Sequence, residues 1–158
     1  MKYNDLLILA NLRENARETL TRMSKRTRIP VSTIFERLKN YDKNIVKKYT
    51  SIIDFTKLGY NTKALILINP MPETRNIVEE FLQKNKTVNS LYKVSTNFEY
   101  LAEVICRDMQ ELQKFLEVIE GLKLKQKEVL FVIDDLKKED FMSSLNLQAM
   151  TSFGGNLE

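Results

Sequence analysis

The chain has 158 residues, of which 43% are apolar and 29% charged, a composition typical of a folded protein with an apolar core. It has no histidine and one cysteine, Cys106, which excludes an intramolecular disulfide and a zinc site of several cysteines, and removes the commonest general base near neutral pH. No apolar run approaches the roughly 20 residues that span a bilayer. Polar side chains also interrupt the first leucines, so we expect no membrane segment, no signal peptide and a cytoplasmic location.

The net charge of +4 conceals an uneven distribution along the chain. Residues 1–60 carry 13 Lys and Arg against 6 Asp and Glu, whereas residues 61–158 carry 12 against 15. A short helical segment with a net charge of +7 favours binding to phosphate groups. We therefore expect a basic module followed by a mildly acidic one with a different role.

The basic module is predicted to consist of three short helices. Apolar spacing places them at about residues 4–13, 18–27 and 31–41. Pro30 suits the start of the last helix, whereas Arg28 occupies the preceding turn, where many such motifs have a glycine. Three helices with a tight turn before the last one form the helix-turn-helix arrangement, whose last helix fits the major groove of DNA.

The last of these helices has a polar side that suits DNA. Ile34, Leu38 and Tyr41 share one side and are expected to face the core, so the other side faces solvent, while the direction of Phe35 does not follow from its position. Arginine can contact guanine or phosphate and asparagine can pair with adenine. The candidate DNA-binding residues are Lys25, Arg26, Arg28, Ser32, Thr33, Glu36, Arg37 and Asn40. On the pattern alone, an ordinary solvated basic surface is an equally good interpretation.

The second module alternates between the patterns of strands and helices. After an extended strand at residues 49–55, strands are predicted at 63–68, 88–95, 98–106 and 128–133, and helices at 73–84 and 109–122. This βαββαβ order is the ferredoxin-like plan, in which two helices cover one face of an antiparallel sheet. We expect a second copy of the chain to cover the other face. A further short helix is expected to contain Phe141, Met142, Leu145 and Leu147.

Taken together, the two modules resemble the Lrp/AsnC family of prokaryotic transcriptional regulators. The segments that carry the resemblance are residues 5–9, 15–17, 31–38, 49–54, 57–59 and 94–101, with Asp108. The resemblance implies an α+β fold whose N-terminal helix-turn-helix (winged-helix-like) domain is joined by a strand linker to a C-terminal ferredoxin-like βαββαβ domain. The implied boundaries are 1–48 for the DNA-binding domain, 49–61 for the linker, 62–137 for the regulatory and oligomerisation domain, and 138–158 for a C-terminal extension.

The function that the resemblance implies is sequence-specific regulation of transcription by a homodimer, tetramer or octamer bound to promoter DNA. No catalytic residues, metal or cofactor are implied, but many members bind an amino-acid effector at an interface between dimers. The candidate effector-binding residues are Thr96, Asn97, Phe98 and Glu99. Here Thr96 replaces a family glycine and Glu99 an aspartate, and a residue with a Cβ restricts the backbone conformations open to this loop.

Two other functions fit parts of the pattern. An architectural protein can compact DNA with little sequence preference, because neutralising phosphates needs no contact with bases. An enzyme similar to the family's sirohaem-type decarboxylases would share the two-domain architecture, but those enzymes use histidines in their cleft and this chain has none.

Overall fold

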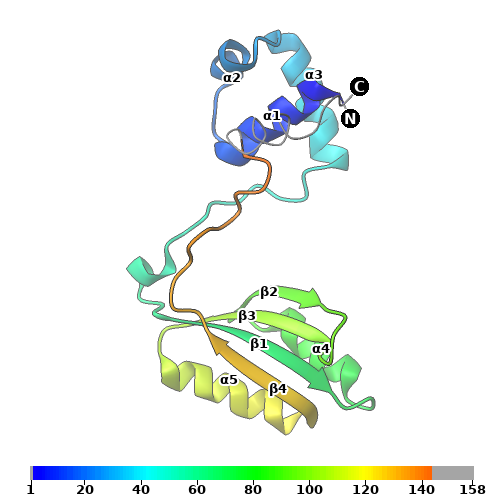
Figure 1. Cartoon of the computed structure of the whole chain (residues 1–158), viewed down its shortest axis with the longest axis vertical. Coiled ribbons are helices and arrows are strands. Elements are labelled where there is room, and N and C mark those ends of the chain that lie inside the picture. The colour runs from blue at the N-terminus through cyan, green and yellow to red at the C-terminus, as the bar shows by residue number, and fades with distance from the viewer. Residues whose placement is uncertain (1, 144–158) are drawn as a thin grey trace. The chain divides into compact units, whose positions relative to one another are not determined.

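The structure is a computed structural model that describes residues 2–143, and it divides into two compact units. Of the described residues, the first unit contains those up to Ser51 together with those from Leu136 onward, and the second contains Ile52–Asp135 (Figure 1).

Three helices form the first unit, as the sequence predicts: α1 (Tyr3–Glu14), α2 (Leu20–Thr27) and α3 (Val31–Asn44). Helix α2 begins later than expected because the Thr19 side chain caps it, accepting a hydrogen bond from the Arg22 backbone N–H at 3.3 Å. Helix α3 continues past Tyr41 because no glycine or proline interrupts it. The buried core consists of Ile8, Leu9, Met23, Ile29, Ile34 and Tyr41.

The strand predicted at residues 49–55 is not formed. Residues 46–54 belong to no helix or strand, and Phe55–Leu58 form the 3₁₀ helix η1, which Gly59 ends in the left-handed conformation (φ 86°). A strand needs a neighbour to complete its ladder of hydrogen bonds, and the described part of this one chain supplies none here. The helix expected near the C-terminus is likewise not seen at Phe141 and Met142, which lie in a turn, while Leu145 and Leu147 lie outside the described residues.

The second unit has the predicted βαββαβ order. Its elements are β1 (Thr62–Pro70), α4 (Arg75–Lys84), β2 (Val88–Lys93), β3 (Tyr100–Cys106), α5 (Met109–Gly121) and β4 (Leu124–Phe131). The strands pair antiparallel in the order β2-β3-β1-β4. Figure 1 shows both helices on one face of this sheet.

The core of the second unit lies between this sheet face and the two helices. Burial alternates along β1, where Ala64, Ile66 and Ile68 are fully buried. The remaining buried side chains of this core are Val78, Leu82, Tyr100, Ala102, Val104, Cys106, Leu112, Phe115, Leu116 and Ile119. Ile77 of α4 is 54% exposed, because Val78 and Leu82, four residues apart, define the buried side of this helix.

The fourth strand also differs from its predicted range. It begins at Leu124 instead of residue 128, because β1 extends to Pro70 and Pro70 pairs with Leu124. It ends at Phe131, and Ile133 beyond it is 99% exposed.

Candidate DNA-binding surface and effector loop

The turn between α2 and α3 is held by hydrogen bonds around a strained residue. Arg28 adopts the left-handed conformation (φ 58°), and its backbone N–H donates to the Ser24 carbonyl at 2.8 Å. The Ser24 hydroxyl donates in turn to the Ile29 carbonyl at 2.6 Å. These bonds end α2 and set the start of α3, the role that a glycine usually fills in such a turn.

One side of α3 is polar and exposed, and we call it the outer face of α3. Its members are Ser32, Glu36, Lys39, Asn40 and Lys43. The candidate DNA-binding residues Ser32, Glu36 and Asn40 therefore lie together on this face, while Thr33 is half-buried beside it. The Asn40 carbonyl and side-chain oxygen both accept hydrogen bonds from Asn44, which leaves the Asn40 amide N–H groups available.

The cations around the turn differ in their surroundings. Arg26 forms ion pairs with Glu14 at 2.8 Å and Glu18 at 3.4 Å, so its charge is largely neutralised within the unit. Lys25 and Arg28 are exposed and form no ion pair among the described residues. The same holds for Lys39 and Lys43, so two uncompensated cations lie on the outer face of α3 and two lie at the turn before it.

Arg37 does not face solvent as the helical spacing predicted. Its guanidinium forms an ion pair with the Asp5 carboxylate of α1, and the Tyr41 hydroxyl donates a hydrogen bond to the same carboxylate. The Arg37 side chain is only 26% exposed. Arg37 and Tyr41 are one turn apart on α3, so both can reach α1, and the arginine joins two helices of the core.

The pKa values of this cluster follow from its contacts. The hydrogen bond from Tyr41, with further help from Arg37 and the Lys2 backbone N–H, holds the pKa of Asp5 below its ordinary value. Burial, together with the bond to Asp5, raises the pKa of Tyr41 to about 12. Asp5 is therefore a carboxylate and Tyr41 a neutral donor throughout the physiological range.

Phe35 is a surface residue that the sequence left unassigned. Its side chain is 45% exposed, and the Lys39 ammonium lies 4.4 Å from the centre of its ring. Helical spacing alone places Phe35 between the core side and the solvent side of α3. The signal in the sequence that favours the solvent side is Lys39, four residues later and therefore a neighbour on the helix surface.

The predicted effector residues lie in the loop between β2 and β3. The Asn69 side chain donates to the Asn97 carbonyl at 2.6 Å, and the Thr96 hydroxyl accepts from the Phe98 N–H at 3.1 Å. The Glu99 carboxylate pairs with Arg75 at 2.7 Å and Lys93 at 3.5 Å. Thr96 is not among the described residues with positive φ, so replacing the family glycine strains no backbone here.

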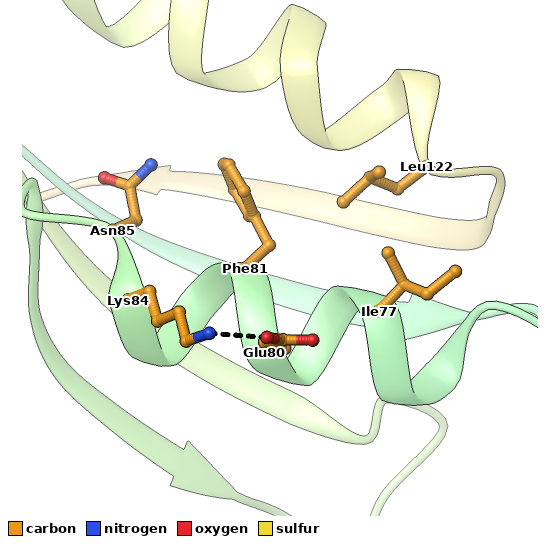
Figure 2. Close-up of a pocket in the computed structure, with 6 residues that line it drawn as sticks. All are labelled: Ile77, Glu80, Phe81, Lys84, Asn85 and Leu122. Carbon is orange, nitrogen blue, oxygen red and sulfur yellow. Dashed lines mark hydrogen bonds and ion pairs between the residues drawn. The ribbon is translucent and has the colours of Figure 1, made fainter.

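A groove of about 460 Å³ lies on the helical side of the same unit, between α4 and the end of α5 (Figure 2). Ile77, Phe81 and Leu122 form its apolar lining, and the Lys84–Glu80 ion pair of 2.5 Å lies at its rim. None of the residues predicted from sequence for DNA or effector binding lines it.

The sheet face opposite α4 and α5, here called the open sheet face, combines apolar side chains with one buried charge. Leu65, Leu67, Leu101 and Ile105 alternate with the core residues and are half-buried. Glu103, 8% exposed, accepts hydrogen bonds from Asn89 at 2.5 Å and Ser90 at 2.9 Å and pairs with Lys63 at 3.0 Å. Burial alone would raise the pKa of Glu103, but these three bonds outweigh it and hold the pKa below its ordinary value.

Other kinds of site are not supported within residues 2–143. No group of three acidic, cysteine or histidine side chains there is arranged to hold a metal ion. Burial raises the pKa of the Cys106 thiol to about 11, which makes it unreactive at neutral pH. No described helix has both the length and the apolar character needed to cross a membrane.

Comparison with known proteins gives a consistent picture. The family model for the Lrp/AsnC ligand-binding domain matches residues 63–141. The transcriptional regulator AzlB of Bacillus subtilis is 32% identical over 116 residues, which are 71% of this chain and 74% of that protein. An HTH-type transcriptional regulator of Pyrococcus abyssi is 30% identical over 132 residues, 80% of this chain and 83% of that protein.

Solved structures agree on the fold. A transcriptional regulator of Neisseria meningitidis, in complex with L-Met, has a TM-score of 0.82 at 22% identity over 94% of this chain and 99% of its own. AsnC of E. coli has a TM-score of 0.77 at 21% identity over 87% of this chain and 95% of its own. These relatives are transcriptional regulators and not enzymes, which sets aside the decarboxylase alternative. The chain belongs to the Lrp/AsnC family of transcriptional regulators and carries that family's ligand-binding domain.

Proposed function

We propose that this regulator binds duplex DNA in a sequence-specific manner through α3 and the turn before it. The observation that carries the proposal is the exposed polar outer face of α3, where two cations on the face and two at the turn before it form no ion pair among the described residues. Uncompensated cations attract the phosphate backbone, and polar side chains on an exposed helix can reach base edges in the major groove.

Each residue has a role that follows from its chemistry and place. Lys25 and Arg28, at the turn, contact phosphates and fix the position of the domain. Ser32 and Thr33 lie in the first turn of α3 and bond phosphate or base edges, while Asn40 donates to adenine and Glu36 accepts from cytosine. Arg26 contributes less to phosphate binding because Glu14 and Glu18 already compensate its charge. We assign Arg37 a different role, that of holding α3 against α1, because its guanidinium is paired with Asp5.

The functional unit is a homodimer or a higher oligomer joined through the open sheet face. Its half-buried Leu65, Leu67 and Leu101 form an apolar cluster on β1 and β3, which a second copy would remove from water, while the neighbouring Glu103 and Lys63 pair with each other. Two-fold symmetry then presents two α3 helices to two half-sites of a pseudo-palindromic operator.

A titration against DNA tests this function. Purified protein is titrated with a duplex that spans its own promoter and with a shuffled duplex, at two salt concentrations. A preference for the promoter of about a thousandfold supports specific regulation. Equal affinity for both duplexes with a steep salt dependence supports the architectural alternative, which the same four cations also favour, and absence of binding contradicts both.

The second unit is proposed to bind an amino acid at the loop of Thr96, Asn97, Phe98 and Glu99. An amino acid carries one positive and one negative group, and the loop brings together the Glu99 carboxylate and the Arg75 and Lys93 cations. The solved L-Met complex of a protein with the same fold supports this class of ligand. Calorimetric titration with each of the common amino acids tests it. Heat with one of them that the Glu99→Gln variant loses supports the site, and no heat with any of them contradicts it.

A further inference from the structure

Phe35 is the largest apolar side chain exposed on α3. With 45% of its surface accessible, it lies neither in the buried core of the first unit nor among the described side chains packed against that core. Its place on the helix explains this, because one residue corresponds to about 100° of rotation and Phe35 follows the fully buried Ile34. The ring therefore lies at the edge of the outer face of α3, next to the polar residues proposed to reach the bases.

The Lys39 side chain lies against this ring. Its ammonium lies 4.4 Å from the ring centre, within the range of a cation–π interaction, and it forms no ion pair among the described residues. An uncompensated ammonium on this face is suited to a phosphate group. Phe35 and Lys39 thus present an apolar ring and a free cation side by side.

The bases of DNA offer one apolar partner to such a ring. In the major groove every base edge presents hydrogen-bond donors and acceptors, and the C5-methyl group of thymine is the apolar exception. Serine, glutamate and asparagine on the same helix face can read donors and acceptors, but none of them recognises a methyl group. A benzyl side chain does so by removing apolar surface of both partners from water.

We infer that Phe35 is a base-reading residue that contacts the C5-methyl group of a thymine in each half-site, with Lys39 on a neighbouring phosphate. This inference rests on the proposed binding of DNA by α3. It adds recognition of the thymine methyl group at one position, which the serine, glutamate and asparagine side chains of this face do not provide.

Replacing thymine by deoxyuracil tests the contact, because this change removes only the methyl group. Duplexes are selected by the wild-type protein from a random library, and each thymine of the selected sequence is replaced in turn. We expect replacement at one position of a half-site to weaken wild-type binding about fourfold, the factor for removing one buried methyl group. Phe35→Ala should bind the thymine and deoxyuracil duplexes equally, and Phe35→Leu, which keeps an apolar side chain, should still prefer thymine.

Tyr3→Ala is the matched control, because Tyr3 is an aromatic residue of α1 that is 50% exposed and distant in sequence from α3. It should show the full wild-type preference for thymine. If no replacement of thymine by deoxyuracil changes the affinity of the wild-type protein, the role of Phe35 is overturned but DNA binding by α3 is not. This result is obtained with the wild-type protein, so it does not depend on whether a variant folds. A deoxyuracil penalty that persists in Phe35→Ala also overturns it, and failure to bind any duplex overturns both proposals.

Discussion

At the scale of single residues, Arg37 connects two helices of the first unit. Its ion pair with Asp5 is mostly shielded from water, since the two side chains are 26% and 18% exposed, and Tyr41 shares the same carboxylate. We expect Arg37→Ala to lower the free energy of unfolding by about 1–3 kcal/mol, because it leaves a partly buried carboxylate with one partner fewer. Urea denaturation at pH 7 measures this change. Arg22→Ala is the control, since Arg22 is exposed on α2 and should have little effect.

The same cluster predicts a dependence on pH. The pKa of Asp5 is held below its ordinary value of 3.8, so the folded state favours the charged carboxylate. The stabilisation from Asp5 is therefore complete above that value and disappears as the pH falls through the lower pKa of the folded state. Asp5→Asn should be less stable than the wild type at neutral pH, and the difference should shrink below about pH 4. A difference that stays constant down to pH 2 would show that the charge of Asp5 plays no part.

At the scale of elements, the turn before α3 carries a measurable strain. Arg28 has a positive φ of 58°, which costs a residue with a Cβ about 1 kcal/mol. Arg28→Gly should therefore raise the free energy of unfolding by about 0.5–1 kcal/mol and, by removing a cation, weaken DNA binding. Arg28→Ala separates the two effects, because it removes the charge and keeps the strain. Equal stability of the glycine and alanine variants would contradict the assignment of strain.

The elements also show how far the sequence alone leads. The helices and strands of both units were predictable, because their apolar side chains recur at helical or strand spacing, as Ile34, Leu38 and Tyr41 do on α3. The prediction of a strand at residues 49–55 was wrong, because the residue pattern reveals an extended tendency but not whether a neighbouring strand exists to pair with it. The predicted direction of the Arg37 side chain, toward solvent, was also wrong. Helical spacing gives the angle of a side chain around the helix axis and cannot show that Asp5 of α1 is within reach.

At the scale of the whole molecule, the open sheet face is the proposed interface between copies of the chain. Leu101 lies on β3, an inner strand of the sheet, where it pairs with Leu67 of β1 and Tyr92 of β2. Leu101→Arg should turn the oligomer into monomers, because a charge would have to be buried between the two copies. Light scattering after size exclusion measures the mass. The control Ile77→Arg, on the exposed side of α4, should leave the mass unchanged. An oligomer that stays intact in Leu101→Arg would show that the interface lies elsewhere.

The central claim is that the first unit binds DNA through the outer face of α3, and charge variants test it most directly. The affinity of the full-length protein for its promoter duplex is measured at several salt concentrations, with Lys39 and Lys43 both replaced by Gln. The control replaces Lys86 and Lys114, which are exposed in the second unit, by Gln. We predict that the first pair weakens binding and lowers the slope of log affinity against log salt by about 1 per lysine, while the second pair changes neither. An unchanged slope for the first pair, or an equal reduction for both pairs, would contradict the account.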